Sequence, residues 1–136
     1  MASATMPSLS VVIPMYNEID NVSPMVARVN ESLAAYNGPW ELLVVDDGSS
    51  DGTPQALHRE TEKYGSHIRV IELRRNFGQT AAMQAGIDEA RGELIATLDG
   101  DLQNDPDDIP RMVVHLLEKD LDLLTGWRKN RKDDLV

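Results

Sequence analysis

Short apolar segments recur along the chain and are separated by polar stretches. Five of them, rich in Val, Ile and Leu, predict β-strands at 9–14, 40–46, 68–73, 93–99 and 122–127. Most are near-continuous apolar runs rather than alternations of apolar and polar residues. Such runs are typical of strands that are covered by helices on both faces, as in a parallel sheet.

Four segments between these strands predict helices. Two carry apolar residues at helical spacing, namely Val22, Met25, Val26, Val29 and Leu33, then Ile109, Met112, Val113, Leu116 and Leu117. The third, 53–64, opens with Thr53 as the expected N-cap and Pro54 as the first helical residue, and the fourth is the alanine-rich 79–90. Because strands and helices alternate, the pattern predicts an α/β fold, a doubly wound and mostly parallel sheet with helices on both faces.

The most unusual polar sequences follow the predicted strands. They are PMYNE (14–18), DDGSSDGT (46–53), RRNFGQT (74–80), DGDLQNDP (99–106) and GWRKNRKDD (126–134). Any one of them is compatible with a turn or a helix cap, since Asp, Gly and Ser are common in turns. Ligands of such sheets bind at the carboxyl ends of the strands, so five unusual loops at that edge favour a binding site.

Asp99 and Asp101 are the strongest candidates for ligand chemistry. Residues two apart in extended backbone point the same way, and Gly100 between them lets a ligand approach the main chain. Paired carboxylates suit Mg²⁺ or Mn²⁺, and Gln103 offers one more oxygen. The acidic residues that follow are expected to begin a helix, where they complement its dipole: Asp105, Asp107 and Asp108.

Other ion and nucleotide motifs do not fit the sequence. An EF-hand loop beginning at Asp99 would need Gly at its sixth position and Glu at its twelfth, where the chain has Asn104 and Pro110. Neither a P-loop nor a G-x-G-x-x-G fingerprint follows the first strand. The absence of a Gly-rich basic loop there also disfavours a nucleotidyltransferase.

A divalent ion at the end of a strand suggests a diphosphate ligand. Glu18 and Asp47 would then accept hydrogen bonds from ribose hydroxyls or base N–H groups, and Tyr16 or Pro14 would pack on the base. For Tyr16, an ordinary half-buried aromatic side chain is an equally good interpretation.

Composition narrows the class of protein. A chain of 136 residues with a net charge of −10 fits one domain and disfavours binding to nucleic acid, apart from the basic cluster that contains Arg128. No cysteine is present, which excludes disulfides and thiolate metal sites. No apolar run is long enough to span a bilayer, so we expect a soluble chain with a disordered tail at 1–8, one domain at 9–128 and a charged tail at 129–136.

Four motifs together resemble the inverting family 2 glycosyltransferases of the GT-A fold. They are VVIPMYNE, VVDDGSSDGT, RRNFGQTAAMQAGIDEARGE and LDGDLQNDP. Within that family they are most similar to the enzymes that load sugars onto dolichyl or undecaprenyl phosphate. The resemblance covers about Leu9 to Arg128 and implies that the nucleoside is held by Pro14, Tyr16, Glu18, Val45 and Asp47, with Gly100 beside it.

The same resemblance implies the remaining roles. Asp99 and Asp101 would hold the metal and the donor diphosphate, Gln103 would be a further metal ligand, and Arg128 would lie near the donor and acceptor phosphates. The implied reaction is in-line attack on the anomeric carbon of a UDP- or GDP-sugar by a polyprenyl phosphate.

Relatives in this group continue into an acceptor region and membrane-associated helices. We therefore expect this chain to be the donor-binding part of an enzyme at the cytoplasmic face of the membrane, weakly active or inactive alone, and able to form homo-oligomers through an open sheet edge. The alternative is a binding or scaffolding module that has lost transfer.

Overall fold

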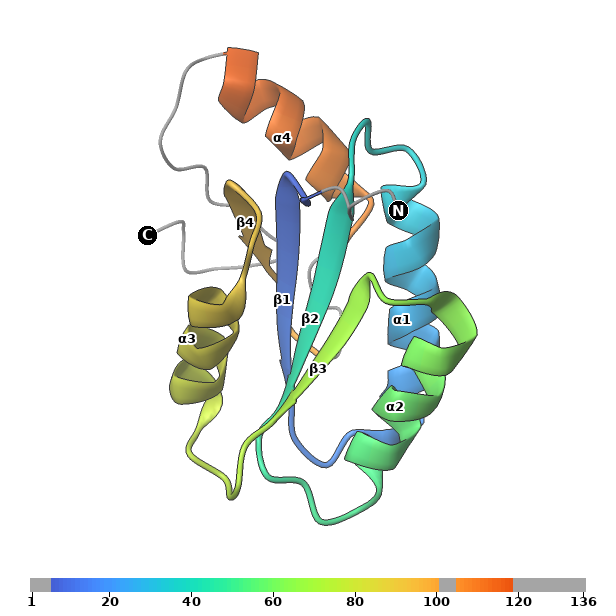
Figure 1. Cartoon of the computed structure of the whole chain (residues 1–136), viewed down its shortest axis with the longest axis vertical. Coiled ribbons are helices and arrows are strands. Elements are labelled where there is room, and N and C mark those ends of the chain that lie inside the picture. Colours follow the sequence, from blue (N-terminus) through green and yellow to red (C-terminus); the bar gives the residue numbers. More distant parts are fainter. Residues whose placement is uncertain (1–5, 101–104, 119–136) are drawn as a thin grey trace.

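The structure is a computed structural model and describes residues 6–100 and 105–118. Strands and helices alternate in the predicted order (Figure 1). The elements are β1 (Leu9–Met15), α1 (Ile19–Leu33), β2 (Trp40–Asp46), α2 (Thr53–Tyr64), β3 (Ile68–Glu72), α3 (Gln79–Glu89), β4 (Leu94–Thr97) and α4 (Asp108–Glu118). The fifth predicted strand, 122–127, lies outside the described residues.

The four described strands form one parallel sheet in the order β3-β2-β1-β4. The chain moves outward from β1 to β3 and then returns to the other side of β1, so the strand order reverses between β1 and β4. The carboxyl ends of β1, β2 and β3 lie in the lower part of Figure 1, and β4 ends beside the middle of β1, where Thr97 pairs with Val12. The predicted α/β fold is confirmed, and the reversal marks where ligands bind in such sheets.

Helices cover both faces of the sheet. α1, α2 and α4 pack on one face over a large apolar cluster that includes Leu42 and Val44, and α3 packs on the other face over Val12, Leu43 and Val45. β1 is buried along its whole length and β2 almost so, whereas β3 and β4 are only partly buried. Within 6–100 and 105–118, no helix combines the length and the apolar character needed to cross a membrane.

Some element ends differ from the prediction. α2 begins at Thr53 with Gly52 as its N-cap, so Thr53 is the first helical residue instead of the cap. β4 spans only Leu94–Thr97, shorter than the predicted 93–99. These shifts arise because hydrogen bonding, which apolar periodicity does not report, sets where an element begins and ends.

α3 lies close against the sheet because its contact residue is a glycine. A Cβ atom at Gly86 would lie 2.4 Å from Cγ1 of Val12 and 3.0 Å from Cγ2 of Val45. Both valines are fully buried and β-branched, so neither side chain can readily move away. Gly86 therefore fixes how closely α3 approaches β1 and β2.

A buried carboxylate holds the turn between α3 and β4 to the sheet. Glu41, only 3% exposed, accepts hydrogen bonds from Ser10 Oγ at 2.6 Å, from Arg91 N–H at 2.8 Å and from Arg69 Nη1 at 3.0 Å. Gly92 N–H in turn donates to Ser10 Oγ at 2.8 Å. Burial alone would raise the pKa of Glu41, but these hydrogen bonds outweigh it and hold the pKa below its usual value.

Replacing Gly86 by alanine tests the close contact of α3. In an exposed helix this change stabilises by about 1 kcal/mol, whereas here the added methyl overpacks the interface, so we expect a net loss of about 1 to 2 kcal/mol in the free energy of unfolding. Urea unfolding measures it. Ala81→Val, which adds volume at an exposed position of α3, should change stability by less than about 0.6 kcal/mol. A Gly86→Ala protein that is more stable than the wild type would contradict the contact.

The Glu41 network predicts a dependence of stability on pH. Because the folded pKa lies below the usual 4.5, the carboxylate stabilises the fold above that pH, and this stabilisation is lost as the pH falls through the folded value. Glu41→Gln should cost about 1 to 3 kcal/mol at neutral pH. The gap to the wild type should shrink on acidification, as measured by urea unfolding across the acid range. The exposed Glu62→Gln variant should show no such convergence.

Candidate functional site

The loops after β1 and β2 are bonded to each other. The N–H of Asn17 donates to Ser49 Oγ at 2.8 Å, and the N–H of Ser50 donates to Asn17 Oδ1 at 2.8 Å. Asn17 adopts a φ of 51°, a left-handed conformation that asparagine tolerates better than most residues. The PMYNE and DDGSSDGT motifs therefore hold each other in shape before any ligand is present.

Asp51 and Thr53 extend the same connection to the start of α1. Asp51 accepts hydrogen bonds from the N–H of Ile19 at 3.2 Å and of Thr53 at 2.9 Å, while Thr53 Oγ1 accepts from the N–H of Glu18 at 3.1 Å. The Thr53 hydroxyl also donates to Asp51 and holds the pKa of that carboxyl below its usual value. These two residues of the DDGSSDGT motif stabilise the loops.

Asp47 connects this pair of loops to the loop between β3 and α3. Its carboxylate, in a residue only 3% exposed, accepts hydrogen bonds from Phe77 N–H at 2.8 Å, Gly78 N–H at 3.1 Å and Asn76 Nδ2 at 3.1 Å. Such a carboxylate organises the main chain around it much as an anion organises a helix N-terminus.

Gly48 allows the backbone of the loop after β2 to contact the backbone of the loop between β3 and α3. Its φ is 73°, and a Cβ there would lie 2.2 Å from the carbonyl carbon of Arg75 and 2.4 Å from the N of Asn76. A side chain is therefore excluded by both conformation and space.

Asp46 is the least satisfied polar group near this edge. It is 2% exposed, and its Oδ2 accepts from Ser49 N–H at 3.1 Å. Its Oδ1 has no hydrogen-bond partner among the described residues. Asp46 is the last residue of β2 and lies in register with Met15 and Glu72.

The chain that follows β4 meets the end of β1. A Cβ at Gly100 would lie 2.6 Å from Oε2 of Glu18 and 2.8 Å from the carbonyl oxygen of Pro14. Asp99, half-buried, accepts a hydrogen bond from Gln79 Nε2 at 3.2 Å. Residues from the first, third and fourth motifs are thus brought together at the point where the strand order reverses.

The predicted nucleoside residues differ in accessibility. Tyr16 is 47% exposed and Glu18 is half-buried, so both can contact a ligand. Pro14 and Asp47 are buried, and the side chain of Val45 lies beneath α3 in the small apolar cluster. Val45 as a whole is 0% exposed, and its main chain lies between β1 and β3 in the sheet.

The predicted metal site is only partly within the described residues. Asp99 and Gly100 lie at the carboxyl edge, whereas Asp101, Gln103 and Arg128 lie outside the described part. Among residues 6–100 and 105–118, no group of three His, Cys, Asp or Glu side chains is arranged to hold a metal ion. A site there would need its further ligands from beyond these residues.

Two of the later aspartates bind α1 as well as preceding a helix. Arg28 lies 2.8 Å from Asp105 and 3.1 Å from Asp107, and Ser32 donates a hydrogen bond to Asp107. α4 begins at Asp108, so the assignment of Asp105 and Asp107 to a helical first turn was wrong. The sequence pattern missed the partner because Arg28 is 77 residues away from Asp105 along the chain.

Gln79 was also missed as a neighbour of Asp99. Its hydrogen bond to Asp99 joins residues 20 positions apart. The signal was its place in RRNFGQT, one of the loops that follow a strand.

Comparisons with known proteins agree on the kind of protein. The family model described as Glycosyl transferase family 2 matches residues 10–136. The chain is 58% identical over 127 residues to the dodecaprenyl-phosphate galacturonate synthase of Rhizobium johnstonii, and it covers 38% of that protein. It is 40% identical over 133 residues to the undecaprenyl-phosphate 4-deoxy-4-formamido-L-arabinose transferase of Salmonella choleraesuis. The matches cover 93% and 98% of this chain, which spans about two fifths of the length of these relatives.

A solved structure shares the fold. The mannosyltransferase PcManGT from Pyrobaculum calidifontis, in complex with GDP-Man and Mn²⁺, superposes with a TM-score of 0.69 at 27% identity. The match covers 82% of this chain and 33% of that one.

The role of Asp47 predicts that its replacement loosens a loop in the absence of any ligand. Both carboxylate oxygens of Asp47 accept hydrogen bonds, whereas Asp47→Asn replaces one of them by an NH₂ group that can only donate. We therefore expect a loss of about 2 to 3 kcal/mol in the free energy of unfolding. The amides of Phe77 and Gly78 should also exchange with solvent faster, as measured by hydrogen exchange. Asp88→Asn, a change at an exposed carboxylate of α3, should do neither. Unchanged exchange at Phe77 and Gly78 would contradict the assignment.

Proposed function

Because the chain belongs to glycosyl transferase family 2, we propose that it binds a nucleotide-diphosphate sugar for transfer to a polyprenyl phosphate. The observation that carries this proposal is that Gly100 lies against Glu18 and Pro14, next to Asp99 with its Gln79 hydrogen bond, where the strand order reverses. The relatives from Rhizobium and Salmonella are named for dodecaprenyl phosphate and undecaprenyl phosphate, and both names support this acceptor class.

The nucleoside would lie over the ends of β1 and β2. Tyr16 offers an exposed ring for stacking, and Glu18 offers a carboxylate for ribose or base donors. Pro14 would contribute its carbonyl group, which lies near Gly100, and Val45 would support the strand beneath the nucleoside. Asp47 Oδ1 accepts only the Phe77 amide among the described residues, so it retains capacity for one donor from the ligand.

The donor diphosphate would lie beside Asp99. The oxygen ligands proposed for a divalent ion are those of Asp99, Asp101 and Gln103, which suit Mg²⁺ or Mn²⁺ in hardness. When bound, such an ion neutralises the charge that grows on the leaving diphosphate. The lack of a side chain at Gly100 lets the chain next to Asp99 pass close to Glu18 and Pro14, because a Cβ there would lie 2.6 Å from Oε2 of Glu18.

The chain's own residues would orient the donor for in-line attack at the anomeric carbon. A phosphate acceptor is already ionised near neutral pH, so a strong general base is not required. Arg128 would lie near the donor and acceptor phosphates. The interlocked loops would supply positioning, because their conformation is fixed before the donor arrives.

Transfer itself would take place in the whole protein at the cytoplasmic face of the membrane. Further parts of the acceptor region and of the membrane contact would come from the part of the relatives' length that this chain does not span. Pairing of chains into a homo-oligomer is a further proposal. A catalytically inactive nucleotide-sugar-binding module remains the alternative.

Calorimetric titration of the chain with UDP, GDP and their sugars, with and without Mn²⁺, tests this function. We expect either the uridine or the guanosine nucleotides to bind, and to bind more tightly when Mn²⁺ is present than when it is absent. Asp99→Ala and Asp101→Ala should each weaken binding in Mn²⁺ by about tenfold or more, because they remove a metal ligand, and should leave metal-free binding within about twofold.

Asp108→Asn is the matched control. It changes a carboxylate of the same acidic stretch that pairs with Arg111 on the surface, and it should preserve the effect of Mn²⁺. Nucleotide binding that ignores Mn²⁺ and survives Asp101→Ala would contradict the enzyme function and favour the inactive binding module.

A further inference from the structure

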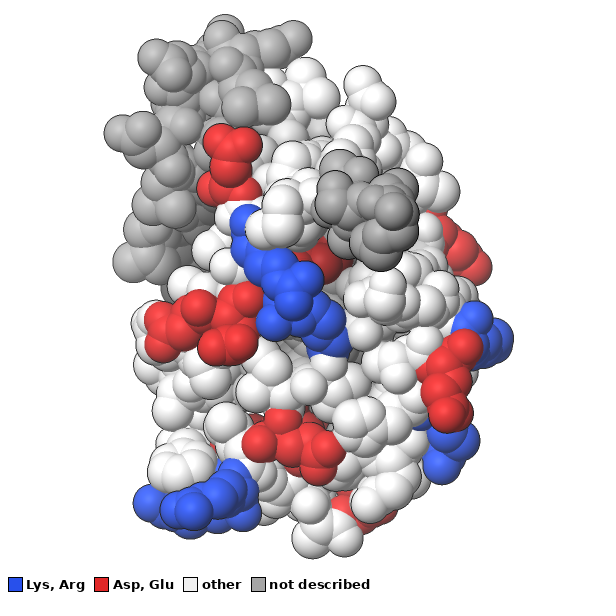
Figure 2. Space-filling model, in the orientation of Figure 1, with Lys and Arg blue, Asp and Glu red and all other residues white. Residues whose placement is uncertain are grey.

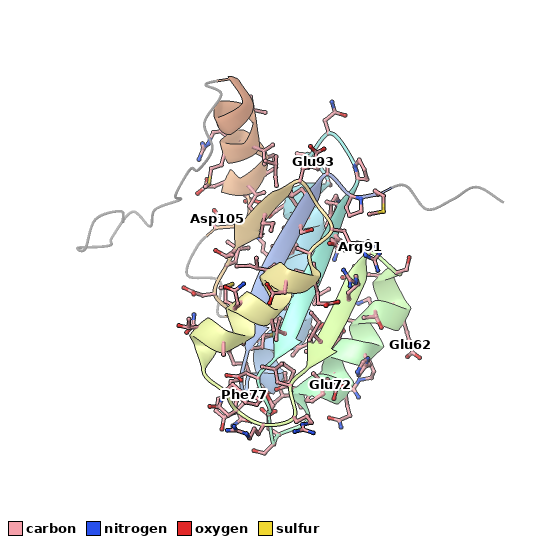
Figure 3. All side chains as sticks on the ribbon, turned by 60° about the vertical axis from the view of Figure 1, so that its left-hand side comes forward. Glu62, Glu72, Phe77, Arg91, Glu93 and Asp105 are labelled. Atoms are coloured by element: carbon pink, nitrogen blue, oxygen red, sulfur yellow. The ribbon has the colours of Figure 1, made fainter. Side chains whose placement is uncertain are left out.

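An arginine and a phenylalanine are paired in the loop between β3 and α3. The guanidinium carbon of Arg75 lies 4.1 Å from the centre of the Phe77 ring. Phe77, the one phenylalanine of the chain, is 48% exposed and lies at the carboxyl edge (Figure 3). A half-exposed apolar ring beside an exposed cation is a surface with both apolar and ionic character.

The main chain beneath this pair is fixed. Leu73 N–H donates to the carbonyl oxygen of Asp46 at 2.9 Å, and Asp47 accepts from the backbone of Phe77 and Gly78. On either side of Arg75, the loop is held through its own backbone N–H groups, those of Leu73, Phe77 and Gly78. Arg75 and Phe77 therefore project from a rigid loop, and their side chains can be changed without removing these bonds.

The charge of this loop is opposite to that of its surroundings. The chain has a net charge of −10, and Glu18, Asp51 and Asp99 lie in the neighbouring loops. Within the described parts of the loops that follow the strands, the cationic side chains are Arg74 and Arg75. Figure 2 shows Lys and Arg atoms gathered at the lower left, where Figure 1 places this loop.

We propose that Arg75 and Phe77 bind the polyprenyl-phosphate acceptor, Arg75 through its phosphate and Phe77 through the hydrocarbon next to it. This inference rests on the proposed function and adds an acceptor contact to it. An acidic protein repels an anionic lipid unless a local cation offsets the repulsion, and this edge supplies that cation next to an apolar surface.

The place of the pair fits an acceptor. The same loop continues to Gln79, which bonds to Asp99 beside the proposed diphosphate position. An acceptor phosphate must approach the donor sugar at that position. Arg75 already covers one face of the Phe77 ring, so the ring offers a nucleobase less stacking surface than the exposed Tyr16 does.

Flotation with phosphatidylcholine vesicles that contain a few mole per cent of undecaprenyl phosphate tests the proposal. The wild-type chain should bind these vesicles more tightly than vesicles of equal surface charge made with phosphatidylglycerol. Arg75→Gln and Phe77→Ala should each weaken binding to undecaprenyl phosphate by roughly fivefold to tenfold. Inorganic phosphate at millimolar concentration should not displace the chain, because it lacks the hydrocarbon.

The matched controls are Arg59→Gln, an exposed arginine on α2, and Val114→Ala, an exposed apolar residue on α4 at the other end of the molecule from this loop (Figure 1). Both should bind vesicles as the wild type does. Equal binding by all variants, no vesicle binding by the wild type, or equal binding to phosphatidylglycerol vesicles would overturn the proposal.

Nucleotide calorimetry on the same variants separates this proposal from the proposed function. Arg75→Gln and Phe77→Ala should bind nucleotide in Mn²⁺ as the wild type does. If they lose nucleotide affinity instead, the pair contacts the donor and the acceptor assignment is wrong. If the wild type itself binds no nucleotide, the proposed function fails whatever the vesicles show.

Discussion

The carboxylate of Asp47 is the interaction on which the functional edge depends. This carboxylate accepts hydrogen bonds from two backbone N–H groups and one side-chain amide of the loop between β3 and α3. The backbone N–H of Asp47 donates to the carbonyl oxygen of Met15 at the end of β1. One residue thus connects the loops that follow three neighbouring strands. A buried carboxylate is stable only where enough donors surround it, so the loop and the aspartate require each other.

The fold was predictable because burial leaves a simple trace in sequence. β1 and β2 are covered on both faces and appear as continuous apolar runs, and α1 and α4 bury one stripe each. The edge of the sheet where the candidate site residues gather was predictable for the same reason, since strand ends follow from strand positions. The apolar periodicity did not predict where each element begins and ends. For example, the N-cap of α2 is Gly52 and not Thr53.

Partnerships between distant residues were beyond the sequence pattern. Asp105 and Asp107 have the composition of a helix start, yet their main partner is Arg28 on α1, whose pKa their charges raise. Asp47 and Asp51 belong to the same motif and look alike as letters, but both support the loops through hydrogen bonds that only the folded chain defines. Val45 matched a position of the family and proved to be buried beneath α3. Residue types therefore indicated which loops come together at the carboxyl edge, but they did not indicate which hydrogen bonds each carboxylate makes.

The mutual bonding of the first two loops also limits how such a site can be rebuilt elsewhere. Asn17 is held by Ser49 and Ser50, and Glu18 by Thr53, so the shape of either loop is encoded partly in the other. Grafting one loop alone onto a foreign scaffold would transfer its amino-acid sequence without the contacts that hold its conformation. The smallest portable unit is the β1 loop together with the β2 loop, along with the two parallel strands that set their separation.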